Sequence, residues 1–322
     1  MNEFDLIRTF FASQGSARDD VAVSIGDDAA VVNVPPGMQQ VITTDVLVAG
    51  THFLAEGDPV GIGHKALAVN LSDLAAMGAT PKWFTLNLCL PEVNTSWLQG
   101  FCRGLFGLAS QWNVSLVGGD TVRGPLTIGI QACGVVPTGK AMLRSGAKVG
   151  DRIYVTGTLG DAGVALLHQR GTLPLEAADF ATVQSRLDSP IPRVSEGLAL
   201  RDFASSCIDI SDGLLSDLRH IATASTVGAR IMLERLPVST VYHTYFEQLD
   251  RWAIALTAGD DYELCFTIPG PRQTDFEQLS AKWQCGATYI GDIETESGVR
   301  VVDRLGVDHK PSTGGYEHFT AD

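Results

Sequence analysis

The sequence predicts an α/β (α+β) fold with two domains: an N-terminal domain that has a mixed or antiparallel sheet with helices, and a C-terminal α/β sandwich domain. Three observations support this prediction. The chain has 322 residues, which is more than one hydrophobic core usually holds. Runs rich in β-branched residues alternate with helix-like segments in both halves. The composition shifts at Pro137-Thr138-Gly139, so we place the boundary there and predict domains 1–137 and 138–322.

The first domain is predicted to begin with an amphipathic helix at 3–13 and an antiparallel meander of strands at 21–25, 29–34 and 41–45. Asp58-Pro59 then supplies an N-cap and a proline at the first helical position, so we expect a helix from there through Asp73 to about Met77. The alternative is a new short helix that has Ser72 as its N-cap. The remaining predicted elements are a strand at 82–90, a helix at 96–112 and strands at 114–117 and 126–136.

The second domain is predicted to open with a strand at 152–156 and a glycine-rich turn that leads into a helix. The same patterns then predict helices and strands that alternate over most of the domain. These elements are helices at 195–204, 213–226 and 273–283, and strands at 206–210, 229–233, 262–268 and 287–291.

The composition is that of a water-soluble protein, with 45% hydrophobic and 19% charged residues. No apolar run reaches the roughly 18 residues of a membrane span, so we expect no membrane association. The net charge of −14 argues against non-specific nucleic-acid binding. The acidic first residues do not resemble a signal peptide, and the six cysteines form no Cys-x-x-Cys pair, so we expect a cytoplasmic protein with reduced cysteines.

Acidic residues recur behind glycine or hydroxyl residues, and several follow apolar runs directly. They occur in Gly26-Asp27-Asp28, Thr43-Thr44-Asp45, Gly118-Gly119-Asp120, Asp209-Ile210-Ser211-Asp212-Gly213 and Gly259-Asp260-Asp261. Asp73 lies in the almost entirely apolar stretch 69–81, three residues after Asn70, so on a helix both would share one face. Carboxylates at strand ends and turns indicate a hard-cation site, since Mg²⁺ is commonly held between a few carboxylates and substrate phosphates.

Two glycine motifs are rejected as nucleotide-binding loops. The segment 134–140 lacks the hydroxyl residue of a phosphate-binding loop, because Ala141 stands in its place, and Pro137 interrupts it. Gly157-x-x-Gly160-x-x-Gly163 lacks the closely spaced glycine pair of a dinucleotide-binding turn, so we interpret it as a tight turn from strand to helix. A nucleotide would therefore be held through metals and carboxylates.

Three further residues are candidates for substrate contacts. Arg144, in a polar loop, could grip a phosphate or could be a solvated surface arginine. His52, seven residues after Asp45, could act at the site or make a structural hydrogen bond. Tyr316, which follows two glycines, could stack on a flat ring or pack the C-terminal segment.

Together and in order, these residues resemble the thiamine-monophosphate kinase family of the aminoimidazole-ribonucleotide-synthetase-like ATP-binding superfamily. The resemblance covers nearly the whole chain, and it is strongest in four stretches. These are Thr43-Thr44-Asp45 with His52-Phe53, the segment 65–79, Gly118-Gly119-Asp120-Thr121 and Asp261-Tyr262-Glu263-Leu264.

The resemblance implies ATP-dependent phosphorylation of thiamine monophosphate to thiamine diphosphate, several Mg²⁺ ions, and a homodimer joined through the N-terminal domains. It implies that the metal ligands are Asp28, Thr43, Thr44, Asp45, Asp73, Asp120, Asp209 and Asp212. The implied ATP contacts are Gly119, Asp120, Arg144 and Ser211, and the implied acceptor contacts are His52, Asp260 and Tyr316. Asp73, Asp120 and Arg144 are the implied catalytic residues.

One departure from the family pattern is present: relatives typically have Glu where this chain has Asp260, which is one methylene shorter.

The nearest alternative assignments within the superfamily are selenophosphate synthetase and the hydrogenase-maturation carbamoyl dehydratase. These enzymes depend on a reactive cysteine or selenocysteine near a glycine-rich N-terminal loop, or on a C-terminal cysteine. This chain has neither. A different class of function is a non-catalytic, acidic, cation-binding scaffold dimer.

Overall fold

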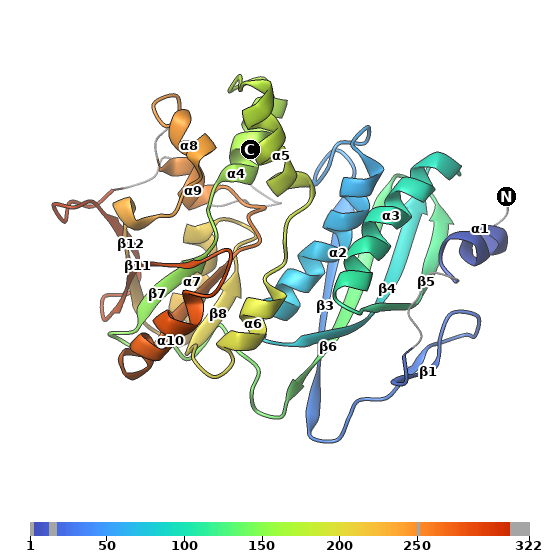
Figure 1. Ribbon diagram of the computed structural model, residues 1–322, viewed down its shortest axis with the longest axis horizontal. Coiled ribbons are helices and arrows are strands. Elements are labelled where there is room, and N and C mark those ends of the chain that lie inside the picture. Colours follow the sequence, from blue (N-terminus) through green and yellow to red (C-terminus); the bar gives the residue numbers. More distant parts are fainter. Residues whose placement is uncertain (1–2, 13–17, 250–251, 310–322) are drawn as a thin grey trace. The chain divides into compact units, whose positions relative to one another are not determined.

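The computed structural model describes residues 3–12, 18–249 and 252–309 (Figure 1). Backbone contacts divide the chain into two compact units. The first comprises Met1–Leu74 and Ala79–Ala141, and the second comprises Ala75–Gly78 and Met142–Asp322. The main division thus lies between Ala141 and Met142, and the boundary expected after residue 137 remains a prediction. Each unit has its own sheet with helices, which confirms the predicted α/β fold class.

The first unit contains a four-stranded mixed sheet with the order β3-β6-β4-β5. β6 pairs antiparallel with β3 and with β4, whereas β4 and β5 run parallel. A separate pair of short strands, β1 and β2, is antiparallel. The strands are β1 (Val21–Val23), β2 (Val31–Val32), β3 (Met38–Val48), β4 (Thr80–Leu90), β5 (Ser115–Arg123) and β6 (Thr127–Pro137).

Helices α1 (Glu3–Phe10), α2 (Pro59–Ala76) and α3 (Thr95–Gln111) belong to this part of the chain, and Figure 1 shows α2 and α3 over the same face of the sheet. Glycines allow α2 and α3 to approach closely. A methyl group on Gly63 would lie 2.0 Å from the carbonyl oxygen of Phe101, and one on Gly104 would lie 1.9 Å from that of Val60. This close packing fixes α2 against α3 and thereby helps to fix the position of Asp73.

The second unit contains a six-stranded sheet with the order β12-β9-β11-β7-β10-β8, antiparallel except for β12 and β9. Its strands are β7 (Arg152–Thr156), β8 (Ser206–Asp209), β9 (Gly228–Met232), β10 (Leu264–Ile268), β11 (Ala287–Glu294) and β12 (Gly298–Val302). Its helices are α4 (Asp161–Gln169), α5 (Ala177–Asp188), α6 (Val194–Leu200), α7 (Leu214–Ser225), α8 (Thr240–Thr244), α9 (Ala253–Thr257) and α10 (Gln273–Ser280). Buried residues from the strands and from α4 and α7 form one large core.

The direction of three strands decides where the polar loops of this unit meet. β7 and β8 both pair antiparallel with β10, which lies between them, so β7 and β8 run the same way. They end at Thr156 and Asp209, and β10 begins at Leu264. The segments 157–161, 210–213 and 258–263 therefore lie at one edge of the sheet.

Several expectations from the sequence are wrong. The meander ends at β2, because β3 pairs with β6 instead. α2 runs without a break through Ser72, so the alternative helix start there is excluded. β5 does not stop before the glycine pair but continues to Arg123, since Gly119 adopts φ +148° and passes so close to Leu86 that a methyl group would lie 1.9 Å from its carbonyl oxygen.

Helices α5, α8 and α9 and strand β12 were not predicted. α8 and α9 have only five residues each, too short to show a helical period. Within the described residues, no helix is both long and apolar enough to cross a membrane.

Candidate functional site

The loop after β8 carries three of the candidate residues, Asp209, Ser211 and Asp212. Asp209 is buried at the end of the strand, whereas Ser211 and Asp212 are half-buried beyond it. Asp217, in the first turn of α7, reaches back to this loop, and its Oδ2 accepts the backbone N–H groups of Ser211 and Asp212 at 3.1 Å each. Burial raises the pKa of the Asp217 carboxyl to about 7, and the negative charge of Asp212 acts in the same direction.

The loop before β10 packs against the first one through its backbone. The N–H of Asp260 donates to the carbonyl oxygen of Ser211 at 2.9 Å, and that of Tyr262 donates to Ile210 at 2.8 Å. Asp260 and Tyr262 both have positive φ, +67° and +49°, which is uncommon for residues other than glycine. Such conformations persist where the surroundings enforce them, and they concentrate at functional sites. The Tyr262 hydroxyl donates to Oδ1 of Asp260 at 3.0 Å.

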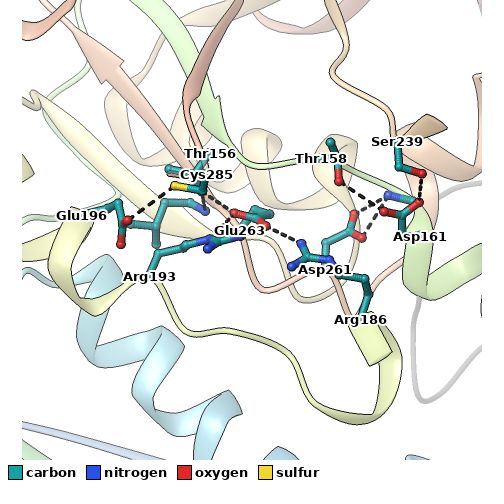
Figure 2. A network of polar contacts seen from close by, with 12 residues as sticks. Thr156, Thr158, Asp161, Arg186, Arg193, Glu196, Ser239, Asp261, Glu263 and Cys285 are labelled. Carbon is teal, nitrogen blue, oxygen red and sulfur yellow. Dashed lines mark hydrogen bonds and ion pairs between the residues drawn. The ribbon is translucent and has the colours of Figure 1, made fainter. Parts of the chain in front are cut away.

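A buried ionic cluster anchors this second loop (Figure 2). The carboxylate of Glu263, whose side chain is 1% exposed, forms ion pairs with Arg186 of α5 and with Arg193, which precedes α6. Thr156, at the end of β7, donates its hydroxyl to the same carboxylate at 2.6 Å. Burial alone would raise the pKa of Glu263, but the hydrogen bonds and charge of Arg193, with the charge of Arg186, hold it below its usual value.

Two further buried acids lie beside this cluster. Both oxygens of Asp261 accept the backbone N–H of Gly160 at 2.9 Å, and Asp161 accepts the hydroxyl of Ser239 at 2.6 Å (Figure 2). Burial raises the pKa of both carboxyls, that of Asp261 well above its usual value. Buried carboxylates of Asp161, Asp217, Asp261 and Glu263 thus anchor the three loops. None of these four residues is among the candidate site residues.

In the first unit, Thr43 of β3 contacts Asp73 of α2. The hydroxyl of Thr43 donates to Oδ2 of Asp73. Asp45 lies two residues further along β3 and therefore faces the same side of the sheet as Thr43. Thr44 faces the opposite side, where it is exposed and donates to the carbonyl oxygen of Ile130 at 3.1 Å. A contact of the Thr44 side chain with a metal at Asp73 is thus not supported by this geometry.

His52 lies in the turn after β3. Its Nδ1 accepts the backbone N–H of Val48 at 3.0 Å, and its carbonyl oxygen accepts the ammonium group of Lys65 at 3.4 Å. A neutral imidazole that accepts at Nδ1 carries its proton on Nε2. The ring is therefore oriented to present a donor at Nε2.

Gly119 and Asp120 line a hollow beside α1, together with Ile7, Phe11 and Ile25. The Asp120 carboxylate is exposed and accepts the N–H of Thr121 at 2.8 Å. Asp28 is also exposed, in the segment between β1 and β2, with its N–H bonded to Asp27. The hydrogen bonds of Asp28 and Asp120 are thus with their neighbours in the chain, whereas that of Asp73 is with Thr43 of β3.

Arg144 lies in the second unit, where its carbonyl oxygen accepts the hydroxyl of Ser225 at 3.3 Å. Its guanidinium is exposed, and its positive charge acts on Asp217, which places it near the loop after β8. Tyr316 lies outside the described residues.

The oxygen donors of these residues suit a hard cation whose coordination is completed by a substrate. In the described part of the chain, no three His, Cys, Asp or Glu side chains are gathered as a metal site of their own. Mg²⁺ in phosphoryl-transfer sites is commonly held by only one or two carboxylates, with phosphates and water as the other ligands. One turn of α2 before Asp73, the buried Oδ1 of Asn70 has no hydrogen-bond partner among the described residues, so this part of α2 carries an oxygen acceptor that the described chain does not use. The residues present therefore fit Mg²⁺.

Sequence reasoning missed the residues that hold the loops in place: Asp161, Arg186, Arg193, Asp217, Asp261 and Glu263. Asp261 and Glu263 lie in a stretch that the family resemblance emphasised, which could have drawn attention to them. Arg186 lies on the unpredicted helix α5, more than 70 residues from its partner Glu263. Pairing over such a separation is visible only in the folded chain.

Two family descriptions match the chain. The AIR synthase related protein N-terminal domain matches residues 26–136, and the AIR synthase related protein C-terminal domain matches residues 148–304. Thiamine-monophosphate kinase of Escherichia coli (strain K12) is 47% identical over 325 aligned positions, which cover 98% of each chain.

Solved structures of thiamine-monophosphate kinases also resemble this chain. Thiamine-monophosphate kinase from Stenotrophomonas maltophilia K279a has a TM-score of 0.84 and 46% identity, over 88% of this chain and 92% of the other. AaThiL, solved in complex with AMPPCP and TMP, has a TM-score of 0.79 and 32% identity over 92% of each chain.

Proposed function

The chain belongs to the AIR synthase related family, and from this membership and its nearly full-length likeness to thiamine-monophosphate kinases we propose that it is a kinase that uses ATP to phosphorylate thiamine monophosphate. The product is thiamine diphosphate. The observation that carries the proposal is the 47% identity over 98% of the chain, which spans both units. The complex of AaThiL with AMPPCP and TMP supports ATP and thiamine monophosphate as the ligands.

The roles of individual residues are part of this proposal. Mg²⁺ ions, held by oxygen ligands, would neutralise charge on the transferring phosphoryl group. The proposed metal ligands are Asp28, Thr43, Thr44, Asp45, Asp73, Asp120, Asp209 and Asp212. Gly119, Asp120, Arg144 and Ser211 would contact ATP, and His52, Asp260 and Tyr316 would contact the acceptor. Thr44 is included through the family resemblance, although its exposed hydroxyl lies on the opposite face of β3 from Thr43 and donates to Ile130.

The acceptor itself explains why the site needs no general base. The second pKa of a phosphate ester is about 6, so the attacking oxygen of thiamine monophosphate is already ionised at neutral pH. Two anions must still be brought together, which costs roughly 4 kcal/mol for unit charges 4 Å apart at an effective dielectric near 20. Arg144 offers a positive charge, and the donor at Nε2 of His52 can orient the acceptor phosphate without removing a proton.

A direct assay tests the function. The purified chain should convert thiamine monophosphate to thiamine diphosphate when ATP and Mg²⁺ are present. If the chain is a non-catalytic scaffold, no conversion should occur. If it is another ATP-using enzyme of the superfamily, ATP should be consumed without formation of thiamine diphosphate.

We expect the transfer to be a single in-line step without a phosphorylated enzyme. Since the acceptor is already a nucleophile, no side chain needs to carry the phosphoryl group. The measurement uses ATP with a chiral γ-thiophosphate. Inversion at phosphorus supports direct transfer, whereas net retention requires a covalent intermediate and contradicts this mechanism.

Asp260→Glu is expected to change the apparent affinity for thiamine monophosphate and to leave that for ATP nearly unchanged. The added methylene moves the carboxylate away from the hydroxyl of Tyr262, which now holds its Oδ1 at 3.0 Å. KM values for the two substrates provide the measurement. Equal changes in both would show that Asp260 is not specific to the acceptor.

A homodimer joined through the first unit is also proposed. Side chains of β3 alternate across the sheet, and those opposite the helices are exposed, including Ile42 at 56% and Val46 at 53%. Exposed Gln131 and Asn87 lie on neighbouring strands of the same face. A second copy of the chain could cover this surface. Sedimentation would measure whether the chain is a dimer in solution.

A cytoplasmic location remains a prediction, which cell fractionation would test.

A further inference from the structure

Asp217 contacts the loop after β8 through a single oxygen atom. Its side chain is in the first turn of α7, and the residue is only 2% exposed. Oδ2 accepts two successive backbone N–H groups, those of Ser211 and Asp212. A carboxylate oxygen that receives adjacent N–H groups fixes the orientation of the peptide between them, because rotation of that peptide would break one of the bonds.

Further backbone groups of the loop are also hydrogen-bonded. The carbonyl oxygens of Ile210 and Ser211 accept N–H groups from the loop before β10, and the N–H of Ile210 donates to the backbone carbonyl oxygen of Glu263 at 2.8 Å. At the end of the loop, Gly213 has φ +107°, and a methyl group there would lie 2.6 Å from the carbonyl oxygen of Thr257. The course of the loop is therefore defined from both sides.

The side chains of Ser211 and Asp212, by contrast, make no hydrogen bond within the described residues. Both are half-buried, and the backbone N–H groups of both residues and the carbonyl oxygen of Ser211 are already paired. Their direction is consequently set by the backbone contacts of the loop, and two of those contacts are made by Asp217.

We propose that Asp217 is a positioning residue: by holding the N–H groups of Ser211 and Asp212 it directs the Asp212 carboxylate and the Ser211 hydroxyl toward a bound metal–nucleotide complex. The proposal rests on the proposed function in so far as that function places a metal and ATP at this loop. Asp217 itself touches neither ligand. Partners that orient metal ligands commonly change metal affinity by about 10–100-fold when they are removed.

The hydrogen-bond acceptor, rather than the charge, is what this role requires. Asp217→Asn keeps a carbonyl oxygen with two lone pairs, so it can still receive both N–H groups. Asp217→Ala and Asp217→Leu remove the acceptor, and leucine fills nearly the same volume. The asparagine variant should therefore bind the metal nearly as well as the wild type does, and the alanine and leucine variants should bind it more weakly.

The test measures binding of Mn²⁺ to the full chain in the presence of β,γ-methylene ATP, by the electron paramagnetic resonance signal of the free ion. Asp217→Ala or Asp217→Leu is expected to weaken Mn²⁺ binding by about tenfold or more, and Asp217→Asn by less than about threefold. The Mg²⁺ concentration that gives half-maximal activity should shift in parallel. If alanine prevents folding, the leucine variant provides the comparison.

Asp151 provides a matched control. It is also a buried acid that anchors a loop, since it accepts the N–H of Lys148 at 3.0 Å and the hydroxyl of Ser205 at 2.6 Å. It directly precedes β7, however, and so lies at the opposite edge of the sheet from the loop after β8. Asp151→Ala should lower stability as Asp217→Ala does, but it should leave Mn²⁺ binding unchanged.

Three results among the variants would overturn the proposal: wild-type Mn²⁺ binding in folded Asp217→Leu, an equal loss in Asp151→Ala, or an equal loss in Asp217→Asn. Absence of Mn²⁺ binding by the wild type would also overturn it. Failure of the proposed function is distinct, because it would appear as no phosphorylation of thiamine monophosphate while the pattern among the variants in Mn²⁺ binding remains.

Discussion

Asp73→Asn should abolish the kinase activity and leave the fold intact. The side chain is half-buried on α2, among residues that are almost all buried and apolar, so its charge has little reason to be there except to bind a cation. Its neighbour Thr43 donates to Oδ2, and an amide oxygen can still accept that hydrogen bond. Loss of a ligand charge beside the transferring phosphoryl group should cost several kcal/mol of transition-state stabilisation.

The measurement is turnover at saturating Mg²⁺, with circular dichroism to check the fold. Asp58→Asn is the control, because it removes a carboxylate from the start of the same helix, where Asp58 accepts the N–H of Val60 at 3.2 Å. Asparagine is as good an N-cap as aspartate, so this variant should keep wild-type activity. If Asp73→Asn kept more than about a tenth of the turnover, a loss of under about 1.4 kcal/mol, the metal role would be wrong.

Glu263→Ala should destabilise the second unit by about 3–5 kcal/mol, because it leaves the paired guanidinium groups of Arg186 and Arg193 without their carboxylate in a buried site. The measurement is the free energy of unfolding in urea. Glu296→Ala removes an exposed partner of Arg300, at 3.8 Å, and should cost less than about 1 kcal/mol. Similar losses in the two variants would show that burial does not strengthen the Glu263 cluster.

The stability difference between the wild type and Glu263→Ala should depend on pH with a definite sign. The folded state lowers the pKa of Glu263, so the folded chain binds that proton less tightly than the unfolded chain does. The stability difference between wild type and Glu263→Ala should therefore be complete at neutral pH, above the usual glutamate pKa. It should decrease as the pH falls through the lowered pKa. A difference that grew on acidification would contradict the assignment.

Local sequence patterns were enough to predict most of the helices and strands. α2 began at Asp58-Pro59 as expected, because a capping side chain and a proline act on the first turn alone. The turn at Gly157 and Gly160 was likewise predicted, and both glycines have positive φ. The resemblance to the thiamine-monophosphate kinase family could also be read from short ordered motifs, and it agrees with the comparisons over nearly the full chain.

What only the tertiary structure decided is which of these residues meet. Sequence placed Thr43, Thr44 and Asp45 in one motif, but the two-residue period of β3 directs Thr43 and Asp45 to one face and Thr44 to the other. The order β7-β10-β8 gathers loops that are about 50 to 100 residues apart in the chain at a single edge. The Arg186 and Arg193 partners of Glu263 follow from the same arrangement, because ion pairing depends on distance in space and burial, neither of which a local pattern contains.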